Sequence, residues 1–497
     1  MKLLHFRNIV LLALSALLIT FCVVQRSPIT DQKRAYGYSW EKEVQIGQQA
    51  DKQIQQQYGI YDDEQLSNYV ENIGQEVLSV SHMRREDTDP KYKETEFYFR
   101  VLNSGTPNAF ALPGGYIYVT RGLLGHLENE AQLAVVLGHE IGHVAARHAS
   151  QRAFEQQMGQ LALIGGAVAG QELLGVPGQS ILNMGGQAAQ FLFLSYSRDD
   201  ERESDRLGVE YSAMQNYAAA EGAGFFSALK RISEQSGQSI PAWASTHPDP
   251  AAREQTIPQL AQEWEEKGYE QTIRDTDQFM QAIDGMVYGE NPREGFTRDG
   301  MFYHPELAFQ FPYPKGWQLA NQPSAVQMVN EDQNAIIVFQ IDSKNNSPKA
   351  SVNEFLNQDG VEPATSSAIS HNGLEGFEAT ASAQTQDGAD VRFYLYSVAY
   401  DGNIYRFVSY TLADQFDEYR SQFEQTANSF RSLEDRSILN IQPARVQAFR
   451  TDRSGTFQSF LPDNLPLELT PEDVAIANQV QLDETIEAGT WIKIPRQ

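Results

Sequence analysis

The amino-acid sequence predicts an α+β protein built from several domains, and three observations lead to this prediction. The chain has 497 residues, which is too long for a single hydrophobic core. Its first half carries apolar residues at helical spacing around a short sheet, whereas alternating strand patterns begin at Phe302. Hydrophobic residues make up 41% of the chain and aromatic residues 11%, so we expect packed domains rather than a disordered chain.

The N-terminus has the composition of an export signal. Lys2 and Arg7 precede an apolar run over residues 9–24, which is short for a membrane span but suits the core of a signal peptide. We expect residues 1–27 to be a signal peptide or, because no A-x-A-like cleavage site follows, an uncleaved membrane anchor. Cys22 is the only cysteine and ends the apolar run, so lipidation is an open alternative. The sequence thus predicts a periplasmic protein associated with a membrane through its N-terminus.

The charge of the chain limits its partners. It contains 65 Asp and Glu residues against 38 Lys and Arg residues, which gives a formal net charge of −27. A surface of this sign is repelled by the phosphates that dominate affinity for nucleic acids. We therefore expect no nucleic acid among the partners.

Helices and then a small sheet are predicted ahead of the first motif. Apolar residues such as Ile46, Ile54 and Val70 recur three and four positions apart through residues 39–80, which indicates packing helices. The period then changes to two over residues 97–101 and again over 116–119, after a Pro-Gly-Gly turn. Both runs are typical of strands.

A helix is predicted from near Glu128 to about Phe154, with one apolar face toward the core. His139 and His143 are four residues apart in the string H-E-I-G-H, so both imidazoles project from one side and can bind one metal ion. Glu140 lies beside the first histidine, where its carboxylate can take a proton from a metal-bound water. Such a string arises by chance in roughly 1% of chains of this length, so the rest of the chain must supply further ligands.

The best third ligand lies in the charged segment Y-S-R-D-D-E-R-E-S-D, residues 196–205. A zinc peptidase site needs three protein ligands and an open fourth position. On a helix, Glu201 and Asp205 share a face, so Glu201 can bind the metal while Asp205 accepts the outer N–H of a ligand histidine. Alone, such a segment is usually a solvated helix face. Its pairing with the histidine helix favours a metal site.

The H-E-x-x-H string with Glu201 and Asp205 resembles the zinc metallopeptidase family of the CAAX prenyl protease and the periplasmic BepA-like proteases. The segment N-A-F-A-L-P-G-G is similar to the family's N-A-x-x-x-P-G-G segment, which implies an edge strand that pairs with the substrate backbone. The resemblance implies a zincin-type, mainly helical peptidase domain, one Zn²⁺ per chain and polypeptide substrates. The residues expected at the substrate edge are Asn108, Ala109, Phe110, Pro113 and Gly114.

A further histidine lies in the segment S-T-H-P-D-P, residues 245–250. The segment resembles a motif that, in envelope relatives, carries a histidine able to take the fourth zinc position. Because Pro248 favours extended backbone before it, His247 can return to the metal or lie elsewhere in its loop. As a ligand in the resting enzyme it would act as a latch that excludes the catalytic water until the loop moves. His148, in contrast, is expected to point off the ligand face and to be structural.

The remaining segments are assigned from composition and pattern. The peptidase domain is expected over 28–274, and within it the apolar residues 161–176 are too short to span a bilayer, so we expect a buried helical hairpin, a mobile cover over the cleft or a membrane-facing surface. Residues 275–299 mix charges with Gly and Pro and are expected to be a linker.

Two smaller units are expected after the linker. Residues 300–435 combine alternating runs with the hairpin signal Asp401-Gly402 and a final helix, and they resemble the PsbP/Mog-like α+β domains. Residues 438–497 resemble a LysM peptidoglycan-binding module in which Ser454-Gly455-Thr456 replaces the usual G-D-T. Peptidoglycan is therefore an expected partner.

The expected function is that of a zinc-dependent endopeptidase of the bacterial cell envelope. Zinc held by His139, His143 and Glu201 would activate a water molecule, with Glu140 as the general base. The expected role is protein quality control or outer-membrane assembly, which would make outer-membrane assembly proteins partners. One alternative is a chaperone-like assembly factor with latent or rare proteolysis. A purely structural metal domain is a second alternative, but such sites are usually closed by Cys and His ligands.

Overall fold

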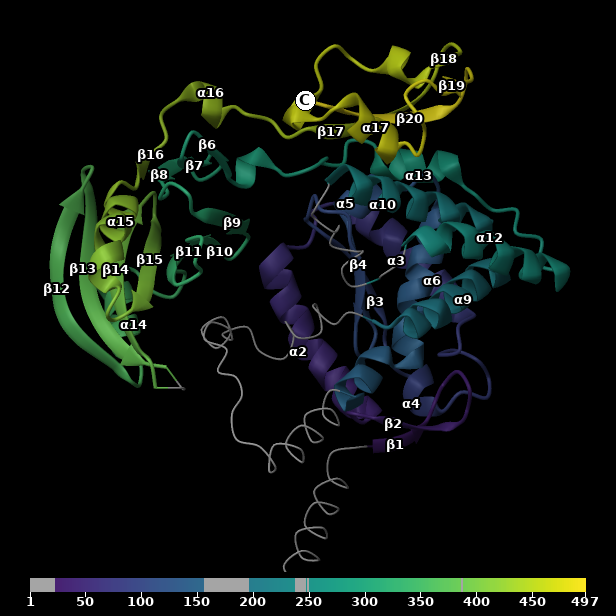
Figure 1. The fold of residues 1–497 in the computed structure, drawn as a ribbon, viewed down its shortest axis with the longest axis horizontal. Coiled ribbons are helices and arrows are strands. Elements are labelled where there is room, and N and C mark those ends of the chain that lie inside the picture. The colour runs from purple at the N-terminus through teal and green to yellow at the C-terminus, as the bar shows by residue number, and fades with distance from the viewer. Residues whose placement is uncertain (1–22, 156–195, 237–246, 248–249, 386–387) are drawn as a thin grey trace, which may run out of the picture.

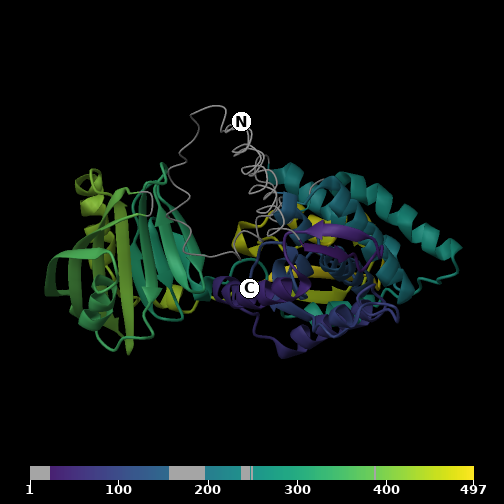
Figure 2. The same cartoon turned by 90° about the horizontal axis from the view of Figure 1, so that it is seen from below.

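The protein folds into a helical body and a sheet-rich body that lie side by side, with the C-terminal strands across the helical body (Figure 1; Figure 2). The structure is a computed structural model that describes residues 23–155, 196–236, 247, 250–385 and 388–497. The predicted signal segment with Cys22, apart from its last residues, and the apolar segment 161–176 lie outside the described residues. Among those described, no helix is long and apolar enough to cross a membrane.

The helical body begins with a strand pair and two amphipathic helices. Strand β1 (Val23–Arg26) pairs antiparallel with β2 (Lys33–Tyr36). Helices α2 (Trp40–Tyr58) and α3 (Glu64–Ser79) follow where helical periodicity predicts them. Ser39 and Asp63 cap their first turns by accepting backbone hydrogen bonds.

A three-stranded sheet follows, in the order β3-β5-β4. Strand β3 (Tyr98–Leu102) runs parallel to β5 (Tyr116–Thr120), and β4 (Ala109–Leu112) pairs antiparallel with β5. Strand β4 therefore lies at an edge of this sheet. Short helices α4 (Pro90–Lys93) and α5 (Arg121–Leu124) complete the region.

Helix α6 (Glu130–Ala146) runs through the core, and each of its residues is buried. It begins after Asn129, whose side chain accepts a hydrogen bond from a backbone N–H of the first turn. It ends because Arg147 adopts a left-handed conformation with φ 59° and ψ 39°. The prediction of one continuous helix to Phe154 is therefore wrong at this residue. The buried guanidinium of Arg147 donates to Glu43 Oε1 at 2.9 Å, which holds the chain in that turn.

Helix α9 (Arg198–Met214) packs unusually close to α6. A Cβ added at Gly138 would lie 2.9 Å from the carbonyl oxygen of Gly208, and a Cβ at Gly208 would lie 2.8 Å from the nitrogen of His139. These neighbours are backbone atoms, which cannot move aside as a side chain can. The close approach brings Glu201 on α9 opposite His139 and His143 on α6.

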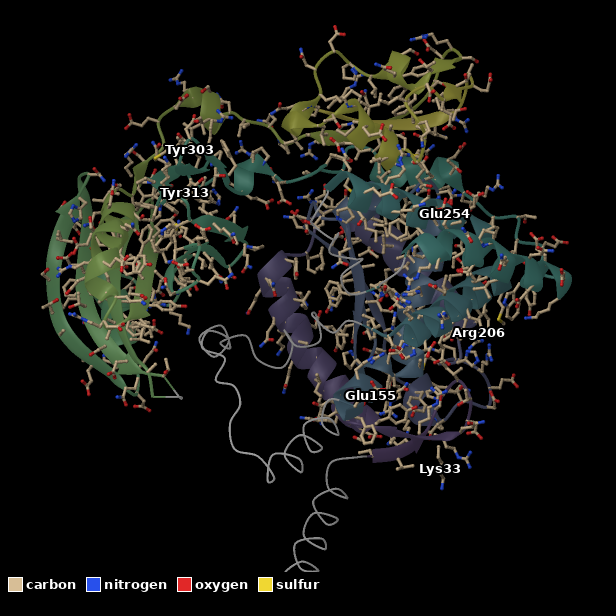
Figure 3. All side chains as sticks on the ribbon, in the orientation of Figure 1. Lys33, Glu155, Arg206, Glu254, Tyr303 and Tyr313 are labelled. Atoms are coloured by element: carbon tan, nitrogen blue, oxygen red, sulfur yellow. The ribbon has the colours of Figure 1, made fainter. Side chains whose placement is uncertain are left out.

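Three more helices close the helical body: α10 (Gly222–Ser236), α12 (Pro250–Glu266) and α13 (Thr276–Ile283), with the 3₁₀ turn η1 (Ala219–Glu221) before them. Helix α13 lies within the range expected to be a linker. Its residues Phe279, Met280 and Ile283 are buried in the same core as α6. Charged residues such as Lys33 and Arg206 are exposed on the surface of this body (Figure 3).

The sheet-rich body contains a seven-stranded antiparallel sheet in the order β12-β13-β14-β15-β11-β10-β9. Leu395 faces helix α14 (Pro348–Leu356), whereas its neighbours Tyr394 and Tyr396 pack in the core with helix α15 (Phe416–Asn428). Asp401 and Gly402 both have positive φ at the β14–β15 turn, which confirms the hairpin read from this pair. The strands of this sheet are β9 (Gln318–Gln322), β10 (Ala325–Val329), β11 (Ala335–Ile341), β12 (Val361–His371), β13 (Leu374–Gln384), β14 (Asp390–Tyr400) and β15 (Asn403–Leu412).

A second, four-stranded sheet in the order β16-β8-β7-β6 packs beside α15. It is preceded by the 3₁₀ turn η2 (Pro292–Glu294). The chain is thus a mixed α+β protein, with a helical N-terminal part and a sheet-rich part after it. The strands of the second sheet are β6 (Phe296–Arg298), β7 (Met301–His304), β8 (Phe309–Pro312) and β16 (Arg431–Ser432).

The C-terminal unit is docked on the helical body (Figure 1). Lys493 is buried, forms an ion pair with Glu128 and donates to the carbonyl of Leu127 at 2.6 Å. Gln479 and Gln132 exchange hydrogen bonds of 2.8 and 2.9 Å. The unit thus contacts the chain where α6 begins. Its elements are α16 (Arg436–Leu439), β17 (Arg445–Arg450), β18 (Gly455–Thr456), η3 (Phe457–Phe460), η4 (Pro466–Glu468), α17 (Pro471–Ala477), β19 (Thr485–Ile486) and β20 (Trp491–Arg496).

Candidate metal centre

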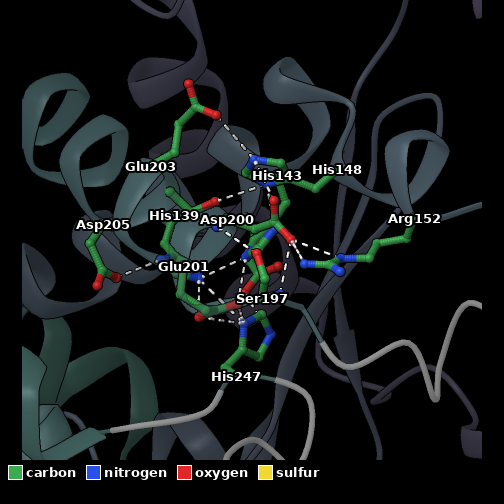
Figure 4. A network of polar contacts seen from close by, with 12 residues as sticks. His139, His143, His148, Arg152, Ser197, Asp200, Glu201, Glu203, Asp205 and His247 are labelled. Atoms are coloured by element: carbon green, nitrogen blue, oxygen red, sulfur yellow. Dashed lines mark hydrogen bonds and ion pairs between the residues drawn. The ribbon is translucent and has the colours of Figure 1, made fainter. Parts of the chain in front are cut away.

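Four buried side chains bring their ligand atoms together between α6 and α9. They are His139, His143, Glu201 and His247, and one ligand atom from each lies within 4.8 Å of the others. The Nε2 atoms of His139 and His143 are 3.0 Å apart. Glu201 Oε1 lies 3.4 Å from His143 Nε2, and Oε2 lies 3.6 Å from His139 Nε2. The structure therefore gathers the three expected ligands at one point (Figure 4).

His247 occupies the remaining side of this cluster. It is fully buried, and its Nδ1 lies 3.1 Å from Glu201 Oε1 and 3.4 Å from His139 Nε2. Its Nε2 lies 3.7 Å from Glu140 Oε1. The sequence left open whether His247 returns to the metal ligands or lies elsewhere in its loop. In the structure it lies among the ligands.

Groups outside the cluster orient the two helical histidines. Asp205 Oδ1 lies 2.9 Å from His139 Nδ1, and His148 Nδ1 lies 3.0 Å from His143 Nδ1. We assign the ring protons of His139 and His143 to these outer nitrogens, which leaves both Nε2 lone pairs directed at the same point. Two lone pairs 3.0 Å apart repel unless a proton or cation lies between them, so this arrangement fits a metal ion.

His148 lies between His143 and an acid on helix α9. It lies just beyond the end of α6, and its Nε2 lies 3.3 Å from Glu203 Oε2 on α9. It is therefore not one of the clustered residues but a support for His143. Tyr196 adds a second support, since its ring stacks on His143 with centroids 4.0 Å apart.

Burial sets the protonation of the cluster. Desolvation lowers the pKa of His139, His143 and His247 below the ordinary value for histidine. Neutral imidazoles are the form that binds metal ions. Desolvation raises the pKa of Glu140 to about 7, against a smaller opposing effect of His247. A carboxylate with this pKa can both accept and return a proton near neutral pH.

The expected substrate-edge residues occupy different places. Ala109 and Phe110 belong to β4, and backbone groups of Ala109 and Ala111 interact with His247 and Glu140, respectively. Asn108 precedes the strand and its carbonyl accepts from Thr120. The Pro113 and Gly114 backbone instead lies against α2: a Cβ at Gly114 would be 2.5 Å from Val44 Cα.

Arg253 on α12 is a member of the site that the sequence did not indicate. Its side chain is 3% exposed and forms ion pairs with both Glu201 and Asp205. The only sequence signal is its position six residues after His247. Glu203 and Tyr196 were likewise not recognised as supports, whereas His148 was expected to be structural.

Comparison with known proteins identifies the domain that carries this site. The model of peptidase family M48 matches residues 64–261. Mitochondrial metalloendopeptidase OMA1 of Schizosaccharomyces pombe is 29% identical over 251 residues, which are 49% of this chain and 67% of that protein. Beta-barrel assembly-enhancing protease of Escherichia coli K12 is 28% identical over 218 residues, 43% of this chain and 42% of that protein. The chain thus spans less than half the length of this bacterial relative.

Some solved structures match about a quarter of this chain. A cyanobacterial PsbP from Synechocystis is 16% identical with a TM-score of 0.23 and covers 27% of this chain and 91% of its own. The yeast Ran-binding protein Mog1p is 12% identical with a TM-score of 0.21 and covers 26% and 93%. Scores this low do not establish a shared fold. Residues 64–261, in the helical body, thus match peptidase family M48, and relatives named as a metalloendopeptidase and as proteases support a metalloendopeptidase activity for this domain.

Proposed function

We propose that this chain is a zinc-dependent endopeptidase of the bacterial cell envelope that hydrolyses peptide bonds of envelope proteins. The observation that carries the proposal is the convergence of His139, His143, Glu201 and His247 beside Glu140. Nitrogen and oxygen donors in this number suit the tetrahedral preference of zinc. When bound, one zinc ion per chain would polarise the scissile carbonyl and make water more acidic.

The remaining chemistry belongs to the side chains of the protein. His139, His143 and Glu201 hold the metal, while Asp205 fixes the ring of His139. Glu140 takes a proton from the attacking water and later gives it to the leaving amine. Its raised pKa of about 7 supports both roles.

Substrate binding is proposed along β4. This strand pairs with β5 on one side and ends its sheet on the other, so an extended peptide can add there by main-chain hydrogen bonds. The backbone of Ala111 faces Glu140, which would place a peptide bond beside the general base. Asn108, Ala109 and Phe110 would contact the substrate backbone, with Pro113 and Gly114 holding the turn that ends the strand.

His247 is proposed to be a latch. Its Nδ1 lies 3.1 Å from Glu201 Oε1, so with zinc bound it would take the position that the catalytic water requires. The enzyme would then be latent until the loop with His247 moves away. A zinc site whose fourth position is held by His247 would seldom admit water. The position of His247 therefore also supports the alternative of a chaperone-like assembly factor that cleaves rarely.

The names of relatives support a proposed biological role. Several are named beta-barrel assembly-enhancing proteases, which supports a role in outer-membrane assembly or protein quality control in the periplasm. We propose membrane association through residues 1–27, by anchor or by lipidated Cys22. We also propose the division into a peptidase domain (28–274), onto whose core α13 at the start of the expected linker (275–299) packs, a PsbP/Mog-like domain (300–435) and a LysM-like module (438–497) that contacts peptidoglycan.

The test is cleavage of an unfolded protein, such as denatured casein, by the zinc-loaded full chain. Glu140→Gln should retain one zinc per chain but cleave at least ~100-fold more slowly. Both forms are also measured with His247→Leu, so that a latched enzyme is not mistaken for an inactive one. Zinc-free protein after loading, or equal cleavage by Glu140→Gln, would refute the proposal. Zinc binding with retention of casein but no cleavage in His247→Leu would favour the chaperone.

A further inference from the structure

Arg253 lies behind the candidate metal ligands, between three helices. It belongs to α12, and its Cζ is 5.2 Å from the ring centroid of Phe226 on α10. Its side chain is 3% exposed. A buried guanidinium is costly unless acids compensate its charge, so its partners are expected to be specific.

The partners are two acids on one face of α9. Arg253 Nη2 forms an ion pair with Glu201 Oε2, and Arg253 Nε lies 3.0 Å from Asp205 Oδ2. Glu201 and Asp205 are four residues apart on the helix, so their carboxylates lie side by side. The planar fork of one guanidinium can contact both at once, which a single ammonium group cannot do as well.

Both acids contact the arginine and the histidines at the same time. Asp205 turns Oδ1 to His139 Nδ1 at 2.9 Å and Oδ2 to Arg253. Glu201 Oε1 lies 3.4 Å from His143 Nε2, while Oε2 contacts Arg253 and lies 3.6 Å from His139 Nε2. The contacts form a closed ring that runs from His139 through Asp205, Arg253 and Glu201 back to the cluster.

We propose that Arg253 is a positioning residue of the metal centre, which fixes the carboxylate of Glu201 beside the histidines and holds Asp205 against His139. The inference rests on the proposed zinc site. Without the guanidinium, two buried carboxylates would repel each other and the Glu201 side chain could rotate about its own bonds. Asp205 would also lose the contact that keeps Oδ1 directed at His139.

The experiment compares zinc affinity of the full chain, by competition with a chelator, among wild type, Arg253→Met and Arg253→Lys. Outer partners of metal ligands typically contribute about 10–100-fold to metal affinity, and we expect a loss of this size in Arg253→Met. Arg253→Lys should recover part of it, because lysine keeps the charge but not the fork. The visible spectrum of the cobalt-loaded protein should change in both variants, since it reports the ligand geometry.

The matched control is Arg406→Met in the sheet-rich body. Arg406 also bridges two acids, Asp342 at 3.5 Å and Glu354 at 3.1 Å, so its loss tests the effect of breaking such a bridge far from the site. It should alter the melting temperature but leave zinc affinity and the cobalt spectrum unchanged.

The outcomes separate this inference from the proposed function. If the wild type binds no zinc, the proposed site is wrong. If the wild type binds zinc and both Arg253 variants match its affinity within twofold with the same cobalt spectrum, Arg253 has no positioning role. Should Arg253→Met fail to fold, Arg253→Lys decides, and wild-type affinity with an unchanged spectrum in that variant overturns the inference.

Discussion

The close packing of α6 and α9 predicts that Gly208→Ala weakens both stability and zinc binding. The new Cβ would lie 2.8 Å from His139 N, 3.0 Å from Val135 O and 3.1 Å from His139 Cα, all within the usual carbon contact distance of ~3.5 Å. Overpacking of this kind costs about 1–3 kcal/mol, whereas Ala gains about 1 kcal/mol over Gly in helix propensity. Because the neighbours are backbone, we expect the upper part of the cost and a net loss of about 1–2 kcal/mol.

Thermal unfolding and zinc competition measure the two effects. Separation of the helices by several tenths of an ångström moves Glu201 away from His139 and His143, so zinc affinity should fall together with stability. Gly142→Ala provides a graded comparison, since its Cβ would lie 3.2 Å from Leu207 Cβ and Ser204 Cα and should cost less. A Gly208→Ala protein at least as stable as the wild type, with undiminished zinc affinity, would refute this account of the packing.

Three further predictions concern His247, Glu140 and Lys493. His247→Leu should raise cleavage of denatured casein by at least several-fold, since it frees the position beside Glu201 Oε1; an equal or lower rate would count against the latch. Burial raises the Glu140 pKa from 4.5 to about 7, so between these pH values the metal-free folded state binds a proton that the unfolded chain has lost. This group therefore lowers stability as pH rises through that window, and denaturant titrations should show a smaller loss in Glu140→Gln than in the wild type. Lys493→Met should destabilise the helical body by about 1–3 kcal/mol because Glu128, which is only partly buried, loses its charged partner, and Glu128→Gln in the same chain should restore much of the melting temperature; additive losses would contradict a direct pair.

Helical spacing was sufficient to find the residues that share an element. His139 and His143 lie one turn apart on α6, and Glu201 and Asp205 lie one turn apart on α9. Each pair therefore faces one way whatever the rest of the chain does. The hairpin at Asp401-Gly402 was equally local, because both residues accept positive φ.

Helical spacing could not predict contacts between different elements. Arg147 ends α6 without a glycine, because Glu43 and a stacked Tyr36 ring, 3.7 Å from its Cζ, hold it in the left-handed region. Periodicity carries no information about partners on other elements of the chain. Arg253 was missed for the same reason, since its acids lie on another helix.

Helix α13 was missed for a different reason. The charges, glycines and prolines around residues 275–299 indicated a connector. Phe279, Met280 and Ile283 nevertheless follow helical spacing and fill the core beside α6. A helix of only eight residues has few apolar positions, so its helical spacing is a weaker signal than the charges, glycines and prolines around it.

The central claim is that His139, His143 and Glu201 hold one zinc ion beside Glu140. Anomalous diffraction at the zinc absorption edge, from crystals of the zinc-loaded full chain, tests it most directly. We predict one dominant peak about 2.0–2.2 Å from both histidine Nε2 atoms and from one oxygen of Glu201. A dominant peak elsewhere in the molecule, or no peak between these side chains, would contradict the account.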